Sequence, residues 1–101
     1  MWTFHLTRAY AHFSLGELES AEVFARKAME HPNATHVAYA TLMAVLALQG
    51  KNEAAREIRS GLLVRKPGYS QKSARDDLFF CANEDFVSRY VEGLRQAGVP
   101  T

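Results

Sequence analysis

The sequence predicts an all-α fold built from helix pairs, on three observations. Helix start and stop signals are dense along the 101 residues. Alternating β-branched runs bounded by turns, which predict strands, are missing. A pattern of a glycine, an alanine five residues later and a closing proline occurs twice. Its members are Gly16, Ala21 and Pro32, and then Gly50, Ala55 and Pro67.

The first two helices are expected at about residues 3–15 and 18–31. Gly16 ends the first, because glycine takes the left-handed conformation common at helix ends. Pro32 ends the second. A third helix at about residues 36–49 follows Thr35 as its N-cap.

The third helix holds the longest apolar stretch, the twelve residues Val37 to Leu48. A bilayer span needs about 20 residues, so this stretch predicts a helix buried on most sides of a protein core. Gly50 ends it, and Asn52 is expected to cap a fourth helix at about residues 53–65.

Two further helices are expected after Ser70 and Asn83 as caps, the first of them reaching about residue 80. The last ends near Gly98 and Pro100 and has an apolar stripe at helical spacing. The stripe consists of Phe86, Val87, Tyr90, Val91 and Leu94.

A helix pair repeated every 34 residues resembles the tetratricopeptide repeat. The resemblance implies a single domain, an α–α superhelix of about three antiparallel pairs, at residues 1–33, 35–68 and 69–101. In this family the glycine makes the turn inside a pair, the alanine allows close helix approach, and the proline ends the pair. The last pair is degenerate and caps the array, because Asp85 stands where a third glycine is expected.

The second pair fits the family's packing positions better than the first. In the second pair these positions hold Tyr39, Leu42, Met43 and Leu46. The same register in the first pair gives His5, Arg8, Ala9 and His12, whereas its apolar face is Leu6, Ala9, Tyr10 and Phe13. The first helix is therefore shifted or faces something outside this chain.

A closer resemblance lies in "AYAHFSLGELESA", "LALQGKNEAAREIRSGLLVRKPGYS" and the terminal "VSRYVEGLRQAGVP". These segments are similar to the C-terminal repeat region of bacterial proteins in which such repeats follow an adenylate/guanylate cyclase domain or a winged-helix transcriptional-regulator domain. The matching end is Gly93, Leu94, Arg95, Ala97, Gly98, Val99 and Pro100. The resemblance implies a signalling or regulatory protein. No residue resembles a cyclase active site or a recognition helix.

Composition narrows the possible partners. The formal charge of +1 gives no global attraction to nucleic acid or membrane. Residues 35–75 carry a net +5 and residues 76–101 a net −3, so they pack together or the middle faces an acidic partner. The single cysteine, Cys81, and the lack of a signal-peptide pattern predict a cytoplasmic location.

Candidate catalytic and metal-binding groups are weak. His5 and His12 lie two helical turns apart, not at the i, i+4 spacing of metal pairs on helices, so packing or a partner-facing surface is favoured. His31 and His36 are expected in a turn, and Cys81 as a small buried hydrophobe. We therefore expect no enzyme, no cofactor and no metal site.

A basic cluster leaves one alternative open. It consists of Arg56, Arg59, Arg65, Lys66, Lys72 and Arg75. A solvated helix face is favoured, and a regulatory domain that contacts nucleic acid through the basic fourth helix is the alternative. Steep salt dependence of DNA binding would support that alternative.

The first helices of tandem repeats line a concave face, and here that face is apolar. Its expected residues, a candidate interaction surface, are Leu6, Tyr10, Phe13, Ser14, Val37, Ala40 and Ala44, extended by Ala47 and Leu48. An apolar face this wide needs an occupant. The chain's own C-terminal helices or a twin subunit are favoured over a partner peptide. The predicted function is a non-catalytic protein-interaction or self-association module with a protein, a peptide or its own copy as partner.

Overall fold

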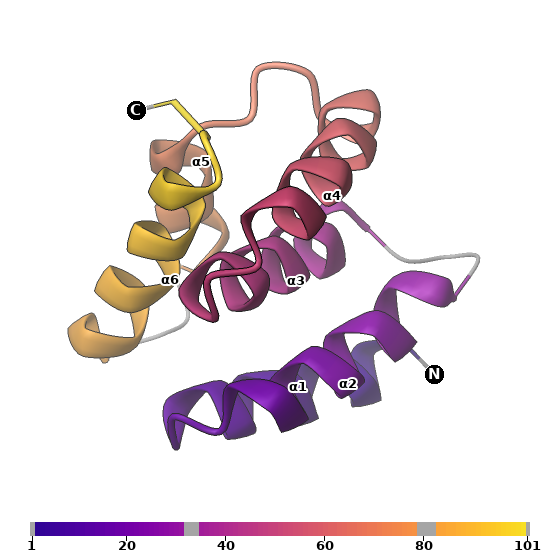
Figure 1. The fold of residues 1–101 in the computed structure, drawn as a ribbon, viewed down its shortest axis with the longest axis vertical. Helices are drawn as coiled ribbons and strands as arrows, with labels where there is room; N and C mark the ends of the chain where they lie inside the picture. Colours follow the sequence, from indigo (N-terminus) through magenta and orange to yellow (C-terminus); the bar gives the residue numbers. More distant parts are fainter. Residues whose placement is uncertain (1, 32–34, 79–82, 101) are drawn as a thin grey trace.

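The computed structural model describes residues 2–31, 35–78 and 83–100, and these residues form helices joined by turns (Figure 1). The helices are α1 (Trp2–Ser14), α2 (Leu18–Glu30), α3 (His36–Leu48), α4 (Asn52–Arg65), α5 (Gln71–Asp77) and α6 (Glu84–Gln96). The all-α prediction is confirmed. Only α5 departs clearly from its expected bounds, since it ends before residue 80. The predictions for Pro32 and Cys81 lie outside the described residues.

The two glycine turns are built alike, as the repeated pattern predicts. Gly16 and Gly50 have φ angles of 77° and 81°, in the left-handed region that favours glycine. In each turn the residue after the glycine donates its backbone N–H to a carbonyl five residues earlier. These bonds run from Glu17 to His12 and from Lys51 to Leu46, both at 2.9 Å.

Three of the four predicted side-chain caps are confirmed. The Thr35 hydroxyl accepts from the Val37 amide, the Asn83 carboxamide accepts from the Phe86 amide, and Ser70 forms a capping box with Ser73. The prediction for Asn52 is wrong, because α4 begins at Asn52 itself and its N-cap is Lys51. The tight Gly50 turn leaves only Lys51 between its glycine and the helix.

Helix α3 is the centre of the molecule, with α1 and α2 on one side and α4 and α6 on others (Figure 1). Nine of its thirteen residues are buried, which confirms the prediction from the apolar stretch. The two repeated alanines, Ala21 and Ala55, are fully buried. Small side chains at these positions let the core pack closely, and larger ones would overfill it.

A polar link joins the two helix pairs. The Glu22 carboxylate on α2 accepts from Lys51 Nζ at 2.8 Å and from Gln49 Nε2 at 2.9 Å, and it also binds Arg26 on its own helix. Burial alone would raise the pKa of Glu22. The bonds from Lys51, Arg26 and Gln49 outweigh burial and lower that pKa to about 2.

Candidate functional site

Most residues of the predicted concave face are covered in the structure and do not form an open surface. Leu6, Phe13, Ala40, Ala44 and Ala47 are buried. Tyr10, Val37 and Leu48 are half-buried, and only Ser14 is exposed. Leu6 and Val37 pack in a small separate cluster with Ala28 and Ala38. The other part of the expected face, around Phe13, Ala40 and Ala44, is a groove between α1 and α3, and its occupant is the chain's own α6.

Aromatic rings make the contact between α6 and the end of α1. Phe86 lies edge-on to Phe13 and Tyr10, with ring centroids 5.1 and 5.6 Å apart. Tyr90 lies 6.1 Å from the Phe13 ring. Such aromatic pairs add about 0.5–1.5 kcal/mol each beyond the apolar area they bury. These rings hold the N-terminal half of α6 against α1.

One hydrogen bond lies at the centre of the contact between α6 and α3. The Tyr90 and Thr41 hydroxyls are 2.8 Å apart, and both residues are buried. Burial first of all raises the pKa of Tyr90 well above its ordinary value, so the phenol stays neutral. A buried hydroxyl without a partner costs about 1–3 kcal/mol, so this bond specifies where α6 docks.

Gly93 marks the closest approach of α6 to α3. A Cβ atom added there would lie 2.6 Å from the Ala44 carbonyl oxygen, which belongs to the α3 backbone. Only glycine fits this contact. Sequence reasoning noted Gly93 within the terminal motif but missed its role, although a glycine inside an amphipathic helix is itself a signal of close packing.

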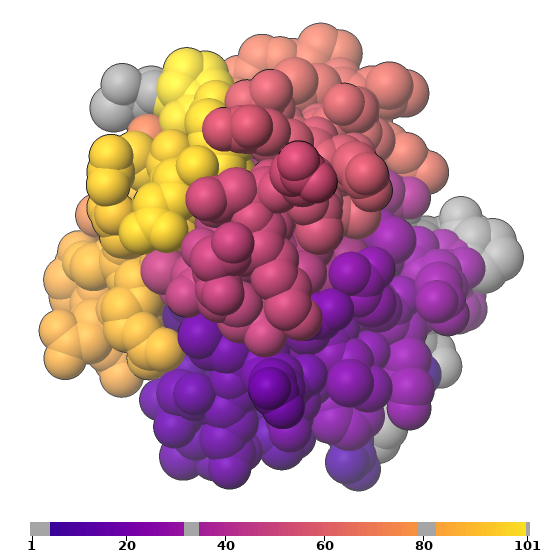
Figure 2. Space-filling view, viewed as in Figure 1, coloured from indigo at the N-terminus to yellow at the C-terminus, as the bar shows by residue number. Residues whose placement is uncertain are grey.

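The residues after α6 fix its C-terminal end. Arg59 Nη1 on α4 donates to the carbonyl oxygens of Ala97 and Gly98, at 3.2 and 3.4 Å. Gln71 on α5 donates through its side chain to Val99 and through its backbone to Pro100, at 2.9 and 2.8 Å. Figure 2 shows these C-terminal residues, in yellow, packed against the middle of the chain. The terminal motif therefore joins three helices.

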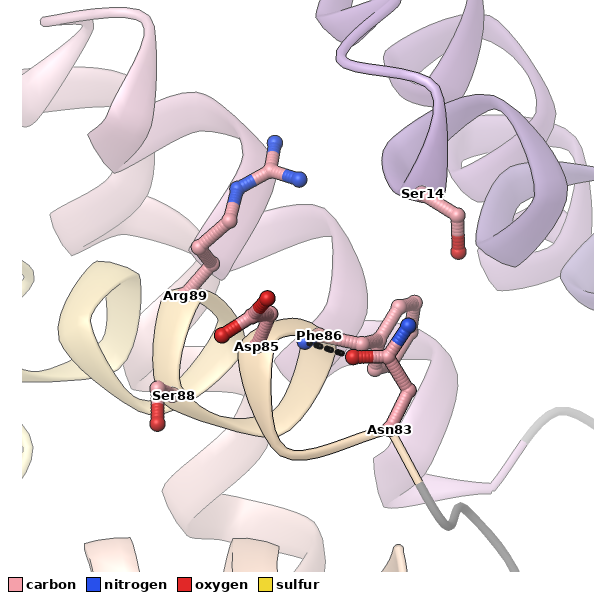
Figure 3. A pocket seen from close by; sticks show the side chains of 6 residues that line it. All are labelled: Ser14, Asn83, Asp85, Phe86, Ser88 and Arg89. Carbon is pink, nitrogen blue, oxygen red and sulfur yellow. Dashed lines mark hydrogen bonds between the residues drawn. The ribbon is translucent and has the colours of Figure 1, made fainter.

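A cavity lies where the end of α1 meets the start of α6 (Figure 3). Its volume is about 420 Å³, and its lining residues are Ser14, Asn83, Asp85, Phe86, Ser88 and Arg89. The Arg89 guanidinium lies 4.9 Å from the centre of the buried Phe13 ring. The cavity holds both a carboxylate and a guanidinium, and the hydroxyl of its lining residue Ser88 donates to Glu84 at 3.2 Å.

Three of the histidines noted in the sequence make ring or polar contacts within the fold. His12 stacks on Phe24 with centroids 5.3 Å apart, and His5 stacks on the same ring at 6.4 Å. Removal from water, followed by nearby positive charges including Lys27, lowers the pKa of His5. His36 Nε2 contacts the Asp77 carboxylate at 2.8 Å, which ties α3 to α5. Across the described residues, no group of three potential ligands is placed to hold a metal ion.

The predicted basic cluster is mostly engaged within the molecule. Arg59 binds the carbonyl of Ala97, as described above. The Arg65 guanidinium lies 4.1 Å from the centre of the Tyr39 ring. Lys72 pairs with Asp76 at 3.5 Å, and Arg75 pairs with Glu84 at 3.1 Å. No described helix is long and apolar enough to cross a membrane.

Comparisons with protein-family models, curated proteins and solved structures yielded no match. The contact of α6 with the groove between α1 and α3 is therefore the basis for proposing a function.

Proposed function

We propose that this chain is a non-catalytic protein-interaction or self-association module whose α1–α3 groove accepts an amphipathic helix. The observation that carries the proposal is the seating of α6. Its buried anchors Phe86, Tyr90 and Leu94 follow i, i+4, i+8 spacing, while Glu84 and Arg95 face solvent. This is the geometry of helix-in-groove recognition, met here within one chain.

The proposal includes a tetratricopeptide-like architecture with a degenerate third pair. The matching glycine turns support it, as does burial of Leu42, Met43 and Leu46 at the family's packing positions. A place in a bacterial signalling or regulatory protein is also proposed, and its support is the terminal motif that begins at Gly93. In this interpretation α6 is the resident ligand of the groove.

A peptide corresponding to residues 83–100 tests the proposal. Fluorescence anisotropy measures its binding to the full-length chain and to a Gly93→Ala variant, whose own α6 docks less tightly. We expect the variant to bind the peptide at least about tenfold more tightly, because its groove is less occupied. A peptide carrying Tyr90→Asp is the matched control and is expected not to bind.

If neither the original chain nor the Gly93→Ala variant bound the peptide measurably, the proposal would be contradicted. This conclusion requires circular dichroism to show that the variant is folded and that its α6 packing is altered. Duplex DNA is the second ligand in the same assay. DNA binding that weakens steeply as salt rises would instead favour the nucleic-acid alternative.

A further inference from the structure

Helices α5 and α6 and the tail Ala97–Pro100 form a unit, called here the C-terminal strap. Gln71 at the start of α5 binds the tail through two hydrogen bonds, at 2.8 and 2.9 Å. Arg75 on α5 pairs with Glu84 on α6 at 3.1 Å. These bonds tie α5 to α6 and to the tail that follows α6.

The strap is joined covalently to α1–α4 only through the α4–α5 connection, residues 66–70. Every other bond between them is non-covalent. Among the described residues, these contacts include His36 with Asp77, Thr41 with Tyr90, and Arg59 with the carbonyls after α6. Each copy of the chain therefore carries one groove and one strap that fits it.

We propose that a second copy of this chain is the partner, and that two copies exchange their straps reciprocally with residues 66–70 as the hinge. The inference rests on the proposed function and names the source of the partner helix. Exchange rebuilds every groove contact between copies without new residues. The balance between closed monomer and exchanged dimer then depends on hinge conformation and on chain concentration.

The hinge itself is sensitive to one residue. Gly68 has a φ of 79°, and no atom lies within 4 Å of a Cβ placed there. A β-branched side chain at Gly68 therefore strains the closed turn through its φ angle, whereas its Cβ atom meets no neighbour. An extended hinge does not need this φ angle, so the exchanged dimer escapes the strain.

Sedimentation equilibrium on Gly68→Val tests the hinge. We expect the dimer dissociation constant to fall at least about tenfold, because a left-handed non-glycine residue is disfavoured by that much or more. A Gly-Ser-Gly insertion after Gly68 is the matched control and is expected to favour the monomer, since a longer loop closes without strain. Gly68→Ala, with a smaller side chain, is the second variant if Gly68→Val does not fold.

Exchange is distinguished from other modes of dimerisation by cross-linking. His36→Lys places an amine beside Asp77, and a carbodiimide joins the two side chains. In dimers assembled from mixed ¹⁴N and ¹⁵N chains, exchange predicts that residue 36 of one isotope is linked to residue 77 of the other. Links only within one isotope, or a dissociation constant unaffected by the hinge changes, would overturn exchange. The anisotropy assay reports groove binding separately, so failure of exchange and failure of the proposed function are distinguishable.

Discussion

Helix α3 is packed on two sides by neighbours that are held in different ways. Helix α4 follows it after a short glycine turn and buries only Ala55 and Leu62 of its fourteen residues. Helix α6 arrives from far along the chain and buries six of its thirteen residues. A neighbour in sequence is positioned by turn geometry, whereas a distant helix must bring enough buried surface to hold itself in place.

The largest expected effect comes from a charge under α6. Phe13→Asp removes a fully buried ring and places a carboxylate in the space it leaves. Even with the Arg89 guanidinium nearby, we expect a loss of roughly 4 kcal/mol or more in unfolding free energy. Val64→Asp on the exposed side of α4 is the control, expected to change stability by less than about 0.5 kcal/mol. Urea denaturation measures the stability of both variants. Equal midpoints would contradict the conclusion that α6 holds itself in place by burying the residues beneath it.

Two glycines inside helices, one on α6 and one on α4, test how closely each helix packs against its neighbour. Alanine at Gly93 meets the α3 backbone, and we expect a net loss of about 1–3 kcal/mol despite alanine's better helix propensity. Alanine at Gly61 on α4 meets only the Tyr39 ring, at 3.2 Å, and that half-buried side chain is able to shift. The Gly61→Ala change is expected to lie within about 1 kcal/mol of neutral. Thermal melting of both variants gives the result, and a neutral Gly93→Ala would rule out the close α3–α6 contact.

A smaller effect is expected at the buried hydroxyl pair. Thr41→Val leaves the Tyr90 hydroxyl without its partner and should cost about 1–2 kcal/mol. Adding Tyr90→Phe should recover much of that loss, because both polar groups are then gone. A double-mutant cycle by chemical denaturation measures the coupling. Strictly additive losses would show that the two hydroxyls do not interact.

The smallest effect concerns pH and the link between the helix pairs. The pKa of Glu22 is lowered to about 2, so its contribution is present above its unfolded value near 4.5 and is lost as pH falls toward 2. Glu22→Gln should therefore reduce stability by about 1 kcal/mol at pH 7 and flatten its dependence below pH 4.5. Denaturation at pH 7 and pH 3 measures this, and parallel pH profiles for both proteins would contradict it.

Local signals made most of the helices predictable. Gly16, Gly50 and the caps at Thr35, Ser70 and Asn83 act within a few residues of themselves, so their sequence context is sufficient. The docking of α6 was left among alternatives, because it depends on contacts such as Gly93 with Ala44 that occur once and have no internal repeat to align. The candidate surface was identified by residue type, but apolar residues alone do not reveal whether the cover comes from the same chain.

The 49-residue separation between Thr41 and Tyr90 also bears on the order of assembly. We expect contacts inside the α1–α2 and α3–α4 pairs, which close short loops, to form before α6 docks, since α6 must close a long loop. During synthesis the N-terminal helices leave the ribosome first, so the nascent chain passes through a stage in which α1–α4 exist without α6. At that stage Phe13 and Ala44 are uncovered, and a chaperone that binds apolar surface has its best opportunity to capture the chain.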